Sequence, residues 1–72
     1  MLDPPLQIKN LKNGDPRIRG LAAFNLGNMG SKAADAIPEL ERIAQSDSEQ
    51  RVRENAKEAL EKIRAAGGRS TK

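Results

Sequence analysis

The sequence predicts an all-α fold of four helices, arranged as two stacked helical hairpins that form a short α-solenoid. Few β-branched residues occur, and no alternating apolar pattern of the kind that indicates strands is present. Helix start and stop signals divide the chain into four helix-sized segments. Apolar positions of the second and fourth segments match at a constant offset of 34 residues. A period of this size made of paired helices is typical of solenoids.

The first helix is predicted over residues 4–13. Asp3-Pro4 is a good start, because Asp accepts bonds from the free N–H groups of the first turn and Pro loses nothing at the first helical position. Gly14 is a good stop, since glycine tolerates the left-handed conformation past a helix end. The apolar positions of this segment are Leu6, Ile8 and Leu11.

The second helix is predicted over residues 16–29. Asp15-Pro16 repeats the start signal of the first helix, and Gly30 provides the stop. Apolar residues follow one another in steps of three and four, as on one stripe of an amphipathic helix. This stripe contains Ile18, Ala22, Leu26 and Met29.

The third helix is predicted to begin between residues 32 and 36 and to run to about 45. Pro38 lies inside this stretch, so the helix either starts late or is kinked there. Its apolar stripe contains Ile37, Leu40, Ile43 and Ala44.

The fourth helix is predicted over residues 49–65. Ser46 with Glu49 and Asp47 with Gln50 both have the spacing of a capping box, so the start is defined to within two residues. The inward-facing residues are Val52, Ala56, Ala59, Leu60 and Ile63. Residues 66–72 have nothing to bury and are expected to form a flexible C-terminal tail. The chain is therefore predicted to hold one domain, residues 1–65, of two repeats over about 4–30 and 31–65.

The motif that begins at the second helix resembles a known repeat family. Asp15-Pro16-Arg17-Ile18-Arg19, followed by Ala22-Ala23, Leu26-Gly27 and Met29-Gly30, is similar to the HEAT-repeat family, and most similar to its short bacterial repeats in phycobilin-lyase-like proteins. The resemblance covers nearly everything from residue 4 to 65. The second copy departs from it at Glu49-Gln50, which replaces Asp-Pro. The resemblance implies a short HEAT-like α-solenoid.

The resemblance also implies a structural ladder between adjacent repeats. In this family, an acid and an arginine at the start of the second helix often link neighbouring repeats. The matching positions here are Asp15 with Arg19, and Glu49 with Arg53. Both pairs have i, i+4 spacing with the acid first, the more favourable orientation on a helix.

Partners of HEAT-like stacks usually dock on the concave surface, which the second helix of each pair lines. On this chain the resemblance therefore implies a partner-binding surface on the second and fourth helices. Its residues are Arg17, Leu21, Phe24, Asn28, Arg51, Asn55, Glu58 and Lys62. Phe24 has two interpretations: it completes the small core, or it is an exposed anchor for a partner or for a second copy of the chain.

The residue types argue against catalysis, and the resemblance implies a non-catalytic protein–protein interaction or scaffold module. The chain has no Cys and no His, which removes thiol chemistry, imidazole bases and the usual zinc ligands, and no cofactor is expected. The serines lie in predicted caps, loops or the tail, and no carboxylate pair is placed to share a site. The alternatives are a nucleic-acid-binding HEAT-like module and, from the resemblance alone, an accessory subunit of a phycobilin-lyase-like enzyme.

The charge pattern favours a protein partner over nucleic acid. Thirteen basic and ten acidic residues leave a net charge of +3. Glutamates interleave with the cations of the fourth helix, and no aromatic cluster is available for base stacking. No apolar run approaches the ~20 residues of a membrane span. The N-terminus also lacks the pattern of a secretory signal, so a cytoplasmic location is expected.

Overall fold

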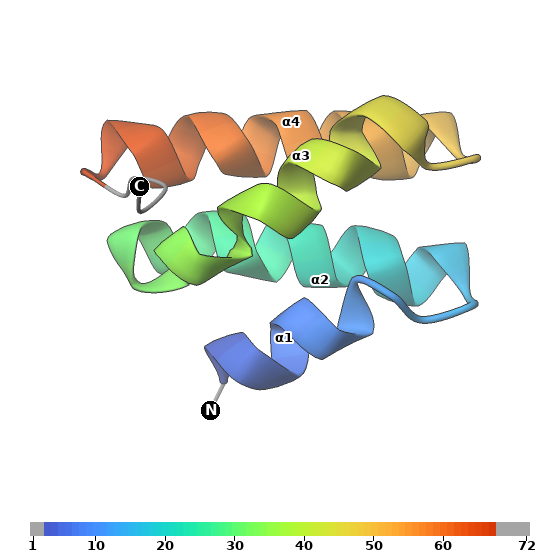
Figure 1. Ribbon diagram of the computed structural model, residues 1–72, viewed down its shortest axis with the longest axis horizontal. Helices are drawn as coiled ribbons and strands as arrows, with labels where there is room; N and C mark the ends of the chain where they lie inside the picture. Colours follow the sequence, from blue (N-terminus) through green and yellow to red (C-terminus); the bar gives the residue numbers. More distant parts are fainter. Residues whose placement is uncertain (1–2, 68–72) are drawn as a thin grey trace.

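Figure 1 shows the computed structural model of the chain, which describes residues 3–67. Helix α1 (Pro4–Asn10) is followed by α2 (Pro16–Met29), the 3-10 helix η1 (Gly30–Ala36), α3 (Ile37–Ser46) and α4 (Gln50–Ala65). These elements account for all the regular structure of the described range. Helices α2 and α4 run side by side in the same direction, whereas α1 and α3 run back in the opposite direction on one side of them (Figure 1).

The first helix is shorter than predicted. Helix α1 has seven residues, and the chain continues after Asn10 in turns in which Lys12 N–H bonds to Lys9 O. Three helices, α2, α3 and α4, have ten residues or more, so the prediction of four helices is correct only in part. Leu6 is half exposed instead of lying in the core. Gln7 takes the inward position, where its Oε1 accepts a hydrogen bond from Asn25 Nδ2 at 3.3 Å.

The third helix starts late and is not kinked at its proline. Pro38 lies in the first turn of α3, where its missing N–H leaves no intrahelical bond unmade. Upstream, Gly30 ends α2 with a φ of +62°, a value that glycine adopts without strain. Residues of η1 then carry the chain back across α2, and Ala33 and Ala36 are buried there.

The core consists of aliphatic side chains contributed by both hairpins. Ile18, predicted to lie in the core, is instead 38% exposed because it lies on the side of α2 that faces away from α4. Met29 and Ile8 are partly buried and pack against the core. The buried residues of the core are Leu11, Ala22, Ala23, Leu26, Ala33, Ala36, Ile37, Leu40, Ile43, Ala44, Val52, Ala56, Ala59, Leu60 and Ile63.

Two glycines let α2 and α4 approach each other closely. A Cβ atom on Gly27 would lie 2.9 Å from the Cα atom of Ala59, closer than real Cβ contacts. A Cβ atom on Gly20 would lie 3.2 Å from Nδ2 of Asn55, which donates a hydrogen bond to Gly20 O at 3.2 Å. The two helices are therefore closely packed against each other at both glycines.

Helix α4 ends at Ala65, next to the first residue of the predicted tail. Ala66 N–H bonds to Lys62 O and Gly67 N–H to Arg64 O, so the helical turn closes at these residues. Residues 68–72 of the predicted flexible tail lie outside the described residues. The division into a domain of residues 1–65 with repeats over 4–30 and 31–65 stays a prediction.

Candidate functional site

The predicted partner-binding residues lie in two stripes, one on each helix of the α2–α4 pair. We call these eight residues the α2–α4 surface. The four on α2 and the four on α4 have the same spacing of four, three and four residues, which places each set on one side of its helix. All are exposed except Asn55, which is half-buried. The α2–α4 surface consists of Arg17, Leu21, Phe24, Asn28, Arg51, Asn55, Glu58 and Lys62.

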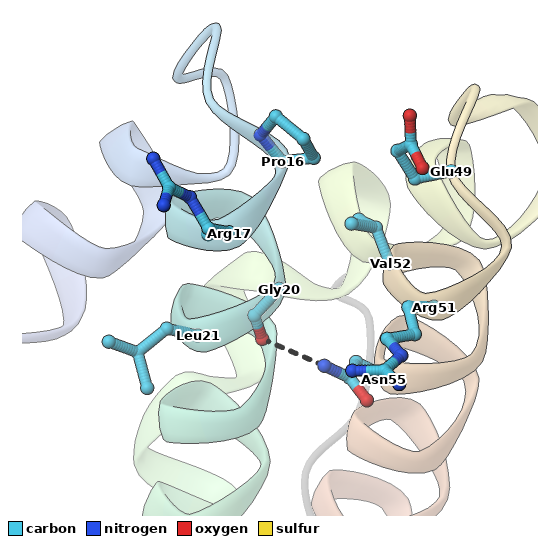
Figure 2. A pocket seen from close by; sticks show the side chains of 8 residues that line it. All are labelled: Pro16, Arg17, Gly20, Leu21, Glu49, Arg51, Val52 and Asn55. Atoms are coloured by element: carbon cyan, nitrogen blue, oxygen red, sulfur yellow. Dashed lines mark hydrogen bonds between the residues drawn. The ribbon is translucent and has the colours of Figure 1, made fainter.

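A groove of about 350 Å³ lies between the N-terminal halves of α2 and α4 (Figure 2). Gly20 and Val52 contribute to its apolar lining, and Asn55 spans the two helices through its bond to Gly20 O. Arg17 belongs to the α2 lining and Arg51 to the α4 lining. Glycine at position 20 keeps the groove open, because it places no side chain there. The groove is lined by Pro16, Arg17, Gly20, Leu21, Glu49, Arg51, Val52 and Asn55.

Phe24, the chain's single aromatic residue, lies on this surface and not in the core. Its side chain is 48% exposed, so the interpretation that it completes the core is wrong. Lys62 Nζ lies 5.5 Å from the centre of the Phe24 ring, within range of a cation–π interaction. The same Nζ donates to Asn28 Oδ1 at 3.4 Å. Residues of α2 and α4 that the sequence separates by 34 or 38 positions are thus brought together.

The link between the two repeats uses a carboxylate that the sequence analysis missed. Arg19 Nε donates to Asp47 Oδ2 at 2.8 Å and Nη2 to Asp47 Oδ1 at 3.1 Å, with side chains only 14% and 6% exposed. Asp15 instead pairs with Arg17 at 2.9 Å. Neither predicted i, i+4 pair, Asp15–Arg19 or Glu49–Arg53, is among the ion pairs of residues 3–67.

A signal for Asp47 is nevertheless present in the repeat. Asn13 occupies the matching position, 34 residues earlier, and both side chains accept a hydrogen bond from the N–H two residues later. Arg19 Nη1 donates to Asn13 O at 2.9 Å, and Arg53 Nη1 donates to Asp47 O at 2.6 Å. The turn before each second helix is therefore built in the same way. Of these two matching positions, the one whose side chain contacts Arg19 has a carboxylate, Asp47, whereas the other has an amide, Asn13.

A family model described as HEAT repeats matches residues 4–70. The chain belongs to the HEAT-repeat family. Neither a search of the curated proteins nor a search of the solved structures gives a match. The family predicted from the sequence is thus confirmed, whereas its phycobilin-lyase-type subgroup stays a prediction.

This HEAT-repeat chain offers no cluster for metal chemistry in the part that the structure describes. No group of three or more Asp or Glu side chains there is placed to hold a metal ion. Within residues 3–67, none of the helices combines the length and apolar character needed to cross a bilayer. HEAT repeats commonly serve as protein-interaction modules, and the family is typically non-catalytic.

The inter-repeat pair makes the stability of this HEAT-repeat domain dependent on pH. Burial raises the pKa of Asp47, but hydrogen bonds from the Arg19 guanidinium and the Glu49 N–H, with the charges of Arg19 and Arg42, outweigh it. The pKa of Asp47 therefore lies below its usual value. Its contribution to stability is complete above the unfolded-state pKa of about 3.9 and is lost as pH falls through the lower folded-state pKa.

We expect the melting temperature of the native chain to fall as pH drops below about 4. The variant Asp47→Asn should be less stable at neutral pH and lose less on acidification, because its amide does not titrate. Some acid dependence should remain, since hydrogen bonds from Arg17 also lower the pKa of Asp15. Thermal melts of both chains between pH 2 and 7 check this. Parallel pH profiles would show that Asp47 does not carry the acid sensitivity.

Proposed function

We propose that the chain is a non-catalytic protein-interaction or scaffold module that binds another protein through the α2–α4 surface. The observation that carries this proposal is the half-exposed Phe24, which lies about one helical turn from the groove residues Gly20 and Leu21. Aromatic side chains anchor protein interfaces because they bury a large area at a low cost in conformational entropy. The groove beside it has room for a side chain of the partner, in the lower range of ligand-sized pockets.

Close packing of the helix pair supports this role. Gly27 against Ala59, and Asn55 against Gly20, hold α2 and α4 at a close and defined separation. A surface presented by rigid helices loses little conformational freedom on binding, so more of the contact energy appears as affinity. We also propose that the chain acts in the cytoplasm and without a cofactor.

Nucleic-acid binding is the second candidate, and the charges favour it less. Arg17 already pairs with Asp15, and Lys62 already contacts Phe24 and Asn28. Glu58 lies on the same surface, and Glu49 lines the groove. Phosphate-driven binding requires a concentration of cations and weakens steeply with salt. An affinity for DNA or RNA that falls steeply between 50 and 200 mM salt would favour this candidate over the protein partner.

The accessory-subunit alternative rests on the resemblance to phycobilin-lyase-like proteins alone. It requires a partner chain to supply the chemistry, because the described residues hold no evident catalytic group. Under this alternative the α2–α4 surface would bind that enzyme, which makes it a special case of the protein-interaction proposal.

The proposal predicts that Phe24→Glu abolishes partner binding without unfolding the chain. A random peptide library selected against the immobilised chain supplies binders, and NMR shift mapping locates them. We expect shifts on the α2–α4 surface and at least a tenfold weaker affinity in the variant, a loss of about 1.4 kcal/mol. Phe24 is half exposed, so the melting temperature should change little.

A matched control for this experiment is Leu6→Glu. Leu6 is exposed to 50%, close to the value for Phe24, but it lies on α1 and outside the α2–α4 surface. Its substitution should leave the selected peptides bound. Peptides that shift residues of α3 instead, or that bind Phe24→Glu as tightly as the native chain, contradict the proposed site.

A further inference from the structure

The two ends of the solenoid differ in how many large hydrophobic side chains they expose. In the described part of the chain, every large hydrophobic side chain that is exposed belongs to the first repeat, on α1 or α2. These side chains are Leu6, Ile18, Leu21 and Phe24. Phe24 and Leu21 belong to the α2–α4 surface, whereas Ile18 lies outside it, so the exposure of Ile18 needs its own explanation.

The repeat explains why Ile18 and Leu21 are apolar. Helix α4 meets α2 through Val52, Asn55 and Ala59, which approach Gly20 and Gly27. At the 34-residue offset, the matching residues of α2 are Ile18, Leu21 and Asn25. Helix α2 therefore carries the same kind of packing stripe that α4 uses.

That stripe of α2 faces away from α4. At about 100° per residue, Ile18 and Asn25 lie about 140–180° around the helix from Gly20 and Gly27, and Leu21 lies about 100–120° from them. Figure 2 shows the Leu21 side chain pointing away from α4. We call Ile18, Leu21 and Asn25 the N-terminal end face. It is a repeat-stacking face whose apolar residues are 38% and 58% exposed.

The other end of the solenoid cannot supply the missing layer. The positions of α4 that match Gly20, Ala23 and Gly27 are Glu54, Lys57 and Glu61, all exposed. Large charged side chains at these positions prevent the close helix approach that the glycines of α2 allow. An apolar face packed on them would also remove water from their charges, which costs free energy. Stacking copies head to tail would therefore place apolar residues against charged ones.

The ion pair between Arg19 and Asp47 also argues against a head-to-tail stack. In a head-to-tail stack, Arg53 of one copy would take the place of Arg19 and meet Asn13 of the next copy. Asn13 offers an amide where Asp47 offers the carboxylate that Arg19 uses. Such a stack would lack the charged link that joins the two repeats inside the chain.

We propose that a second copy of the chain covers the N-terminal end face, in a two-fold symmetric dimer that packs α2 against α2. A two-fold interface brings the same patch together from both subunits, so apolar residues meet apolar residues and the charged ends stay in solvent. The polar side chain of Asn25 can be covered in this interface, because its Nδ2 already donates to Gln7 Oε1. The N-terminal end face shares Leu21 with the α2–α4 surface, whereas Ile18 lies outside that surface. Substitution of Ile18 therefore tests the dimer, and substitution of Phe24 tests the proposed function.

The mass in solution tests the dimer. With few apolar residues per copy, we expect a dissociation constant of roughly 10–1000 μM, so sedimentation equilibrium up to about 1 mM should show the mass rising. The rise should run from the 7.8 kDa of one chain toward twice that value. Ile18→Glu should weaken the dimer at least about tenfold. The chain should still fold, because Ile18 lies outside the core.

The control substitution introduces the same residue elsewhere. Gln45→Glu changes an exposed residue of α3 and should leave the dissociation constant unchanged. A chain that stays monomeric at 1 mM, or a dimer that Ile18→Glu does not weaken, overturns the proposal. Selected peptides should still bind Ile18→Glu, so failure of the dimer and failure of the α2–α4 surface are told apart.

Cross-linking tests the symmetry. The chain has no Cys, so a single introduced thiol reports only its own contacts. Leu21→Cys, in the middle of the N-terminal end face, should form a disulfide-linked dimer under mild oxidation. Lys57→Cys, on the outward side of α4, should stay monomeric. Cross-linking at position 57 instead, or open-ended growth of the mass with concentration, would indicate another arrangement and overturn the two-fold dimer.

Discussion

Replacing Asp47 with Ala is expected to lower the free energy of unfolding by about 2–4 kcal/mol, a large share of the stability of so small a domain. Asp47 holds Arg19 of the other repeat through two hydrogen bonds with both side chains largely buried. Its loss leaves the Arg19 guanidinium with only the carbonyl oxygens of Asn13 and Gly14 as acceptors. The melting temperature should fall by about 10–25 °C.

The matched control for Asp47→Ala is Asp15→Ala. Both side chains accept a hydrogen bond from the N–H two residues later, so both variants lose one such bond. Only Asp47 also links the two repeats, whereas Asp15 pairs with the exposed Arg17. Urea and thermal melts should therefore show the smaller loss for Asp15→Ala. Equal losses would mean that the turn, and not the link between repeats, supplies the stability.

A double-mutant cycle isolates the pair itself. Arg19→Ala, Asp47→Ala and the double variant should give a coupling energy of at least about 1 kcal/mol, because the two groups contact each other in a largely buried position. Additive effects of the two substitutions would show that the ion pair contributes no net stability.

Replacing Gly27 is expected to have the second large effect, and Gly27→Ala should be less stable than Gly20→Ala. Each Gly→Ala change inside α2 gains about 1 kcal/mol of helix propensity. At Gly27 the new Cβ atom would lie 2.9 Å from the Cα atom of Ala59, so the backbone of α4 has to move. Overpacking of this kind costs about 1–3 kcal/mol, which exceeds the gain or cancels it.

At Gly20 the nearest group is the amide nitrogen of the Asn55 side chain, at 3.2 Å, and a side chain shifts more easily than a backbone. We expect Gly20→Ala to be near neutral and Gly27→Ala to be destabilised relative to it. Gly27→Leu should be worse by several kcal/mol, because no space exists between the helices at this position. Denaturant melts of the three variants measure this order. Gly27→Ala as stable as Gly20→Ala would contradict the close approach of α2 and α4.

Local signals in the sequence predicted most of the helices. Asp15-Pro16 and Gly30 bound α2 as expected, since caps and glycine stops act through neighbouring backbone groups. The end of α1 was less predictable. Gly14 is not its stop, because the chain leaves the helix at Asn10 and reaches the glycine through turns.

The candidate site was predicted in part. The residue spacing predicted that Phe24 lies in one stripe along α2 and that Lys62 lies in the matching stripe along α4. Whether Phe24 was buried depended on what packs above it, which helix periodicity does not contain. Asp47 was missed for a related reason: a contact across 28 residues has no local signature.

The sequence by itself determined that this chain is helical, repeats with a 34-residue offset and belongs to the HEAT-repeat family, because propensity, capping and periodicity act within a few residues along the chain. Only the tertiary structure decided which side of α2 faces α4, and with it the exposure of Ile18, Leu21 and Phe24 and the pairing of Arg19 with Asp47. The physical reason is that these features depend on the distance between segments remote in sequence, which the glycines of α2 and the side chains of α4 set together.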